Sequence, residues 1–265
     1  MNKITVSAFV GSCLLSLAGC ASMLGDFNEV LVGVNKGDAN KVREAARAGD
    51  TYEDGTKEIN GSNICGERPL HLAIQKGNLE ITEILLQEGA DPDLPSDIPR
   101  EPSVCKSFGI LKTTPGLPPM HYAIKESKPA FAEALLFAGA NPDLTTAEGK
   151  TAHDLALGKA GFELLVAYIE SPAHLAARTG NVGSLNAAAR EGTNLNSVMS
   201  QTGTTPLDEA LAARKFYVVD FLFENGGGIQ DTISSAEATV AVGEYLDENG
   251  GTANAEKLRD MTARR

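Results

Sequence analysis

The most constraining feature of this sequence is the stretch from Glu67 to Leu94, which reads ERPLHLAIQKGNLEITEILLQEGADPDL. Pro69 suits the first position of a helix, because that residue's N–H has no partner within the helix and the fixed φ of proline is already helical. A short apolar helix follows and stops at Gly77, a residue that tolerates left-handed backbone. A second helix, with apolar residues at helical spacing, runs from Leu79 to Gly89. Such a short helix pair cannot bury its apolar face alone, so the stretch predicts stacked neighbours.

Versions of this pattern recur along the chain. In each version the residues that end the two helices are 12 positions apart: Gly37 and Gly49, Gly77 and Gly89, Ser127 and Gly139, and Gly180 and Gly192. Further first helices are expected to begin at Pro119, Ala152, Pro172 and Pro206. Residues 26–50 match the pattern only in their second helix, so they predict an N-terminal cap with a more polar outer face.

The motifs Pro-Leu-His-Leu-Ala, Leu-Leu and Gly-Ala-Asp, with a glycine between the helices, resemble those of the ankyrin-repeat family. The resemblance covers roughly residues 30–230 and is strongest at 67–94 and 117–144. It implies an all-α solenoid of about five to six helix-turn-helix repeats with an insertion loop and helical caps. Residues 231–265 predict the C-terminal cap, followed by a basic tail that frays.

Two segments depart from the repeat length. The distance from Pro69 to Pro119 is 50 residues, against a usual period of about 33, and the excess lies in a segment rich in Pro and Ser at 95–117. We expect this segment to be an insertion loop at one edge of the stack. The repeat that begins at Ala152 is instead cut short, because Pro172 follows after only 20 residues. We expect a local kink there and less binding surface.

The first residues of the chain predict a secretory signal. Lys3 precedes an apolar run that ends in Leu17-Ala18-Gly19-Cys20. This ending resembles the bacterial lipobox, in which removal of residues 1–19 leaves a lipid-bearing cysteine at the new N-terminus. The resemblance implies that acyl chains on Cys20 anchor the protein, with 20–29 as a short linker, and Ala21 favours the periplasmic side of the outer membrane. The alternative is an uncleaved anchor, or an ordinary signal with a chance cysteine.

The chain is acidic, with a formal net charge of -12, and it would carry -13 once the signal with its one cation is removed. This charge argues against binding to nucleic-acid phosphates as the main activity. It favours a basic partner if electrostatics steers the encounter. Acidity that serves solubility alone is an equally good explanation.

Cleavage and lipidation would leave Cys65 and Cys105 as the remaining cysteines. In an oxidising compartment two such cysteines are expected to pair. The closed loop would span 40 residues, which corresponds to about 4 kcal/mol of stabilisation on the chain-entropy model. The alternative is two free thiols in a redox or metal site, although the sequence has no C-x-x-C motif.

The sequence gives no positive support for an enzyme. Its histidines all lie at or beside one repeat position, the fourth residue of the helix starts: His71, His121, His153 and His174. In ankyrin repeats this imidazole bonds to the backbone of adjoining turns, so we expect a structural role and no metal site. Gly149-Lys150-Thr151 fails as a phosphate-binding loop, because Leu144 stands where the first glycine is required. We expect no catalytic residue, metal, cofactor or small-molecule substrate.

The remaining candidates for function are surface residues. By resemblance to the ankyrin family, a partner is bound by the finger tips and the exposed ends of the first helices. Carried over by position, the partner-binding residues are Glu67, Gln75, Lys76, Leu117, Lys125, Glu126, Arg178 and Thr179. Any one of them is equally well explained as ordinary solvated helix surface.

We therefore predict a lipid-anchored, non-enzymatic module that binds another protein on the periplasmic side of the bacterial outer membrane. One alternative is an immunity protein that neutralises a periplasm-acting antibacterial toxin. A second alternative is an envelope enzyme that uses the insertion loop. The residues do not identify the partner.

Overall fold

The computed structural model describes residues 28–51, 55–100, 102–107, 115–228, 233 and 235–263. The predicted signal peptide and Cys20 lie outside these residues. The described residues form helices and no strand, apart from an isolated antiparallel bridge between Thr51 and Lys57. The chain divides into two compact units, Met1–Leu155 and Ala156–Arg265, where the sequence predicted one repeat domain. Among the described helices, none is long and apolar enough to cross a membrane.

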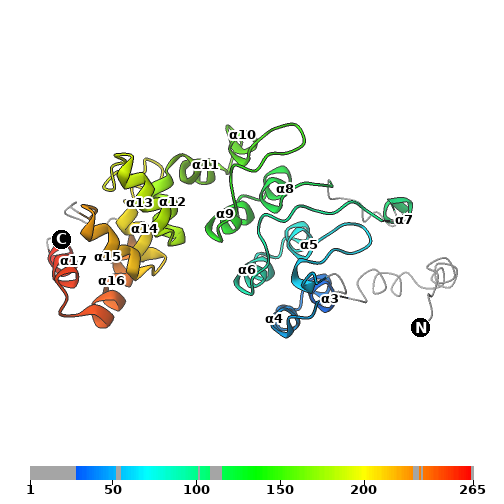
Figure 1. Cartoon of the computed structure of the whole chain (residues 1–265), viewed down its shortest axis with the longest axis horizontal. Coiled ribbons are helices and arrows are strands. Elements are labelled where there is room, and N and C mark those ends of the chain that lie inside the picture. The colour runs from blue at the N-terminus through cyan, green and yellow to red at the C-terminus, as the bar shows by residue number, and fades with distance from the viewer. Residues whose placement is uncertain are drawn as a thin grey trace. The chain divides into compact units, whose positions relative to one another are not determined.

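The first unit is a stack of helix pairs (Figure 1). Its helices are α3 Glu29–Lys36, α4 Ala39–Ala48, α5 Pro69–Lys76, α6 Leu79–Gln87, α7 Pro102–Ser107, α8 Pro119–Lys125, α9 Pro129–Phe137 and α10 Ala152–Ala156, with a 3₁₀ turn η2 at Glu58–Asn60. The first helices pack in the order α3, α5, α8, and the second helices pack in the order α4, α6, α9. Side chains such as Ile74, Ile81 and Leu135 are fully buried in this stack. The neighbours that the segment 67–94 required are therefore present.

Helix α5 shows how the sequence starts and stops these short helices. Pro69 is its first residue, as predicted, and Gly77 ends it with a φ of +72°. The N–H of Gly77 donates to the carbonyl of Ile74 at 3.0 Å. Asn78 then caps α6, because its side-chain oxygen accepts a hydrogen bond from the N–H of Ile81 at 3.0 Å. One turn thus satisfies free carbonyls of one helix and free N–H groups of the next.

The left-handed turn is kept even where glycine is missing. Ser127 stands at the position of Gly77 and has a φ of +56°, and Arg214 has a φ of +54° in the second unit. A left-handed conformation costs such a residue about 1–2 kcal/mol. The helices on either side of the turn impose it, because α8 must fold back against α9 for both to be buried.

The start of the insertion runs alongside the turn that precedes α5. The N–H of Asp97 donates to the carbonyl of Gly66, and the N–H of Arg100 donates to that of Ile64, both at 2.8 Å. Gly66 has a φ of +79°, and a Cβ at this position would lie 2.2 Å from the carbonyl oxygen of Asp97. The insertion can therefore approach this closely only because residue 66 is glycine.

A disulfide also ties the insertion down. Cys65 is bonded to Cys105, and their Cα atoms are 5.7 Å apart. Both cysteines are buried. Cys105 lies in helix α7, so the insertion contains a short helix that its composition did not predict. Pro102 supplies the start of that helix, and the bridge holds it against the turn before α5.

Arg68 closes the base of the insertion. Its Nε donates to the carbonyl of Pro95 at 2.7 Å, and its Nη1 donates to the carbonyl of Asn60. Its Nη2 lies 3.4 Å from the carboxylate of Asp97. Arg68, which directly precedes the first residue of α5, therefore holds the start of the insertion in place.

The second unit contains the remaining helices, which are α11 Glu163–Glu170, α12 Pro172–Thr179, α13 Val182–Arg190, α14 Pro206–Ala212, α15 Phe216–Glu224, α16 Ala236–Asn249 and α17 Ala253–Ala263. Its first helices pack in the order α12, α14, α16. Ser171 alone separates α11 from α12, which leaves no room for a turn and finger in the shortened repeat. The kink that we expected at this repeat stays a prediction.

Helices α16 and α17 close the second unit. Tyr245 of α16 is fully buried, and its hydroxyl donates to the carboxylate of Asp220. Asn254 of α17 donates to the same carboxylate at 2.9 Å. Leu258 of α17 is buried in the core of the unit. The tail that we expected to fray is therefore helical as far as Ala263, because its apolar residues have a core to pack against.

We predict that Gly66→Ala destabilises the protein more than Gly55→Ala does. Both glycines have a positive φ, +79° and +83°, but a Cβ at Gly55 would meet nothing within 4 Å. Gly66→Ala should lower the free energy of unfolding by about 3 kcal/mol, from strain and a backbone clash, and Gly55→Ala by about 1 kcal/mol, from strain alone. Denaturant titration measures both. Equal losses for the two variants would contradict the close approach of Asp97.

Candidate functional site

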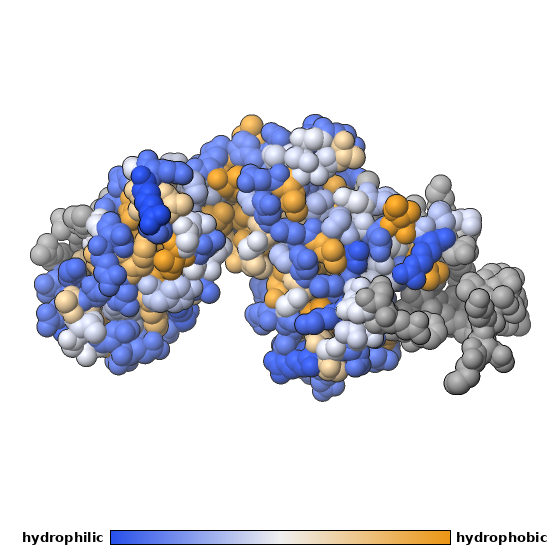
Figure 2. Space-filling view, viewed as in Figure 1, coloured by the Kyte–Doolittle hydropathy of each residue, from blue (hydrophilic) through white to orange (hydrophobic). Residues whose placement is uncertain are grey.

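Four of the predicted partner-binding residues lie at the ends of α5 and α8 in the first unit. Lys76, Lys125 and Glu126 are exposed, and Gln75 is half-buried. Because α5 packs directly on α8, these residues belong to neighbouring turns of one stack. On the face shown in Figure 2, polar and charged side chains surround scattered apolar ones in each unit. The four candidate residues are charged or carry an amide, so they offer a partner ion pairs and hydrogen bonds.

Glu67 points inward, and its prediction as a partner contact is wrong. Its side chain is almost completely buried. Its carboxylate accepts hydrogen bonds from the Asn63 amide at 3.0 Å and from the Gln75 amide at 3.3 Å. The Asn63 side chain in turn accepts from the N–H of Glu67 at 3.0 Å. The carboxylate therefore fastens the turn before α5 to the body of that helix.

Leu117 is also buried, so its prediction as a partner contact is wrong. Its carbonyl accepts a hydrogen bond of 2.8 Å from Nε2 of His71. This bond crosses from one repeat to the next. Leu117 therefore belongs to the contact between repeats, which sequence spacing alone could not distinguish from the exposed edge.

Tyr122 of α8 is a polar residue that the sequence reasoning missed. It is 1% exposed, and its hydroxyl has no hydrogen-bond partner among the described residues. Burial raises the pKa of this hydroxyl to about 12, with a further contribution from the charge of Glu126 and an opposing one from the Gln75 amide. It therefore stays protonated at neutral pH. The sequence did contain a signal for this buried hydroxyl, because Tyr122 stands at the repeat position that Leu72 occupies in the segment 67–94.

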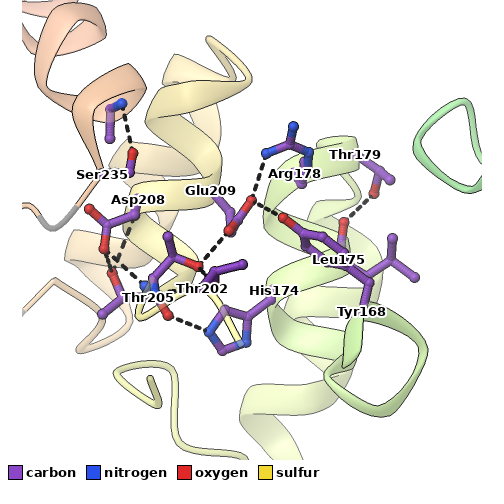
Figure 3. Close-up of polar contacts among 12 residues, drawn as sticks. Tyr168, His174, Leu175, Arg178, Thr179, Thr202, Thr205, Asp208, Glu209 and Ser235 are labelled. Carbon is purple, nitrogen blue, oxygen red and sulfur yellow. Dashed lines mark hydrogen bonds and ion pairs between the residues drawn. The ribbon is translucent and has the colours of Figure 1, made fainter. Parts of the chain in front are cut away.

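In the second unit, a buried carboxylate joins three helices (Figure 3). Glu209 of α14 accepts hydrogen bonds from the hydroxyl of Tyr168 in α11 at 2.7 Å and from Nη1 of Arg178 in α12 at 2.9 Å. Its other oxygen accepts from the hydroxyl of Thr204 at 2.6 Å. The side chain of Glu209 is only 3% exposed. Three donors compensate for the cost of burying this charge.

Arg178 and Thr179, both predicted to contact a partner, are engaged inside this unit. The guanidinium of Arg178 lies 5.8 Å from the ring centroid of Tyr168 and is bound to Glu209. Burial by itself would lower the pKa of Arg178, but the oxygens of Tyr168 and Glu209 outweigh burial and raise it. The hydroxyl of Thr179 donates to the carbonyl of Leu175 at 2.8 Å. Partner binding by these two residues stays a prediction.

Aspartate replaces histidine at the fourth position of two helix starts. In α14 the side chains of Thr205 and Asp208 cap each other's backbone, with the N–H of Asp208 donating to Thr205 Oγ1 at 3.2 Å. Thr151 and Asp154 make the same exchange at α10. This reciprocal cap fixes the helix start locally. Histidine instead reaches the neighbouring repeat.

The buried histidines face backbone carbonyls. Nε2 of His71 donates to Leu117, and Nε2 of His174 donates to the carbonyl of Thr204 at 3.1 Å. His121 makes no hydrogen bond among the described residues. Burial lowers the pKa of all three imidazoles, that of His71 to about 4, so they are neutral at pH 7. In the described part of the chain, no three His, Cys, Asp or Glu side chains are grouped so that they could hold a metal ion.

Comparisons with known proteins agree with the repeat pattern. Residues 31–146 match the family model for ankyrin repeats in three copies. Among solved structures, the ankyrin repeat domain of Bcl-3, described as a unique member of the IkappaB protein family, is similar. The similarity has 18% identity and a TM-score of 0.40, and it covers 75% of this chain and 86% of that one. A search of curated proteins finds no match.

The predicted fold class, an all-α ankyrin-repeat solenoid, is confirmed by the family match and by the stacked helix pairs. Ankyrin repeats indicate a module for protein–protein interaction, and the match points to no enzyme family. The exposed ends of α5 and α8 lie within the matched residues. They are the candidate site.

We predict that Glu209→Gln strongly destabilises the second unit. The change takes the charged partner from half-buried Arg178 and places an amide NH₂ donor among the donors that face buried Glu209, which should lower the free energy of unfolding by about 3 kcal/mol. The matched control is Glu244→Gln, which removes an exposed carboxylate 2.6 Å from Nε of Arg214 and should cost much less because solvent screens that pair. Denaturant titration of both variants measures the difference. If Glu209→Gln cost no more than the control, the network would be unimportant for folding.

Proposed function

We propose that this chain, which carries ankyrin repeats at residues 31–146, is a non-enzymatic protein-binding module displayed in the bacterial cell envelope. The match to ankyrin repeats is the observation that carries the binding function. Stacked repeats leave the ends of their first helices exposed, and here those ends bear charged side chains that no neighbouring repeat covers. The module acts as a scaffold that holds one partner at the envelope.

The anchor in this proposal is a lipid on Cys20. Lys3, the apolar run from Ile4 to Leu17 and the tetrapeptide ending in Cys20 support it together. Each buried CH₂ of an acyl chain contributes about 0.8 kcal/mol to membrane binding, and stable anchoring takes more than one chain or signal. The Cys65–Cys105 disulfide supports an oxidising compartment, in agreement with the periplasmic side of the outer membrane.

The proposed contact set is the exposed edge of the first unit, formed by Gln75, Lys76, Lys125 and Glu126. These side chains come from two adjacent first helices, so a single partner segment can touch all four. Glu67 supports this edge, because its carboxylate accepts a hydrogen bond from the Gln75 amide.

A second candidate function is immunity to a periplasm-acting antibacterial toxin. The net charge of -12 favours it, because an acidic binder attracts and occludes a basic toxin. The two functions differ in when the partner is present, since a scaffold has its partner in a resting cell and an immunity protein does not. Deletion of an immunity protein should be lethal only beside toxin-bearing kin.

We predict that Cys20→Ala abolishes incorporation of a fatty acid and leaves residues 1–19 uncleaved, because the thiol that would carry the lipid is lost. Cell fractionation and labelling with a radioactive fatty acid measure the effect. Cys13→Ala is the matched control, since Cys13 lies inside the predicted signal and should leave the label and the fractionation unchanged. Fatty-acid labelling of Cys20→Ala at the level of the unchanged chain would contradict the lipid anchor.

We predict that crosslinked pull-down of the full-length protein from whole envelopes enriches a specific protein. A variant with Gln75, Lys76, Lys125 and Glu126 changed to Ala should lose it, because the edge then lacks both lysines and the hydrogen-bonding groups beside them. The control variant changes exposed residues of the second helices to Ala, namely Glu44, Glu80, Glu83 and Gln87. Equal enrichment by all three proteins would place the contact elsewhere. Absence of any enriched protein, in envelopes with and without toxin-bearing kin, would refute the binding function.

A further inference from the structure

Three lysines end three consecutive first helices of the first unit. Lys36 is the last residue of α3, Lys76 of α5 and Lys125 of α8, and all three are exposed. Because α3 packs on α5 and α5 packs on α8, these residues follow one edge of the stack. We call Lys36, Lys76 and Lys125 the lysine row.

Helix stability alone does not explain the lysine row. A cation near a helix C-terminus is favourable in itself. Yet among the second helices of this unit α4 has Arg47 in its last turn, whereas α6 and α9 have no cation there. The end of α5 is already served by Lys128, whose Nζ donates to the carbonyl of Ile74 and, at 3.0 Å, to that of Gln75. Lys76 is therefore not needed to neutralise that helix end.

The lysine row is positively charged, whereas its surroundings are acidic. The chain as a whole is acidic, and the exposed residues on the finger turns and on α6 include carboxylates: Asp91, Asp143, Glu148, Glu80 and Glu83. Within the described ranges, neither Lys36 nor Lys76 forms an ion pair. The positive potential of Lys36 and Lys76 is thus directed outward.

We infer that the lysine row binds an acidic, extended segment of the protein partner, an inference that rests on the proposed protein-binding function. Packed helices lie about 8–10 Å apart. A polyproline II segment has three residues per turn and rises about 3.1 Å per residue, so it presents every third side chain on one face at intervals of about 9 Å. Carboxylates at positions i, i+3 and i+6 of such a segment match three lysines on three stacked helices.

Glu126 modulates this site. It directly follows Lys125 and is exposed, so its negative charge weakens the positive potential at one end of the row. Glu126→Gln should therefore strengthen binding of the acidic segment. A purely structural role for the lysines gives no reason for such a gain.

The probes for the test are three labelled peptides of equal length. The first is Glu-Pro-Ser-Glu-Pro-Ser-Glu, which favours polyproline II and has a carboxylate at every third residue. The second is Glu-Glu-Glu-Pro-Pro-Ser-Ser, which has the same composition with adjacent carboxylates. The third replaces each Glu of the first with Gln. Fluorescence anisotropy measures their binding to the full chain in non-ionic detergent at low salt, where surface charge is least screened.

The spaced acidic peptide should bind about tenfold more tightly than the neutral one, and more tightly than the peptide with adjacent carboxylates. Changing Lys36, Lys76 and Lys125 to Ala should remove this preference. The control variant changes three exposed cations of the same unit, Lys57, Arg100 and Lys150, to Ala and keeps the same net charge as the test variant. It should retain the preference.

Equal binding of the spaced and neutral peptides, or equal loss in both variants, overturns the inference. Equal binding of the two acidic peptides overturns the match in spacing. If the preference is absent but envelope capture still depends on the α5 and α8 edge, the partner is not acidic and the binding function stands. If envelope capture also fails, the binding function fails with it.

Discussion

The structure depends on the fact that no helix pair of this chain can bury its apolar face without a neighbour. Stacking therefore explains local features that the residues of one helix pair do not explain. Ser127 and Arg214 hold a left-handed conformation that isolated residues of their type avoid, because the helices that flank each turn must fold back on each other. Lys128 likewise serves the end of α5, although it belongs to the next helix pair, where it directly precedes α9.

Polar contacts determine how successive repeats are joined, and the chain uses more than one solution. His71 and His174 reach carbonyls beyond their own helix pair, at Leu117 and Thr204. In the second unit a buried carboxylate, Glu209, gathers donors from two other helices and from the preceding turn. These inward-facing polar groups make the repeats specific for their neighbours, and they leave recognition to the outward-facing ends of the helices.

Net charge and local charge differ on this molecule. The acidic total governs long-range steering, whereas the edge made by α3, α5 and α8 presents cations at a spacing set by helix packing. The insertion lies at the other end of α5, where Gly66, Arg68 and the Cys65–Cys105 bridge hold its start close to the stack.

The helix pairs and their ends could be predicted from the residue pattern, because proline starts, left-handed glycines and apolar spacing act within a few residues of each other. It also singled out Cys65 and Cys105 as a pair. Which polar residues face inward depends on the packing between helices and could not be predicted. Glu67 and Leu117 occupy positions that look exposed in the repeat, but contacts with Asn63 and His71 bury them. Tyr122 and Glu209 look like apolar helix positions, and only packing between helices reveals a buried hydroxyl and a buried carboxylate there. Local chemistry determines where a helix begins and ends, whereas burial depends on residues that are distant in sequence.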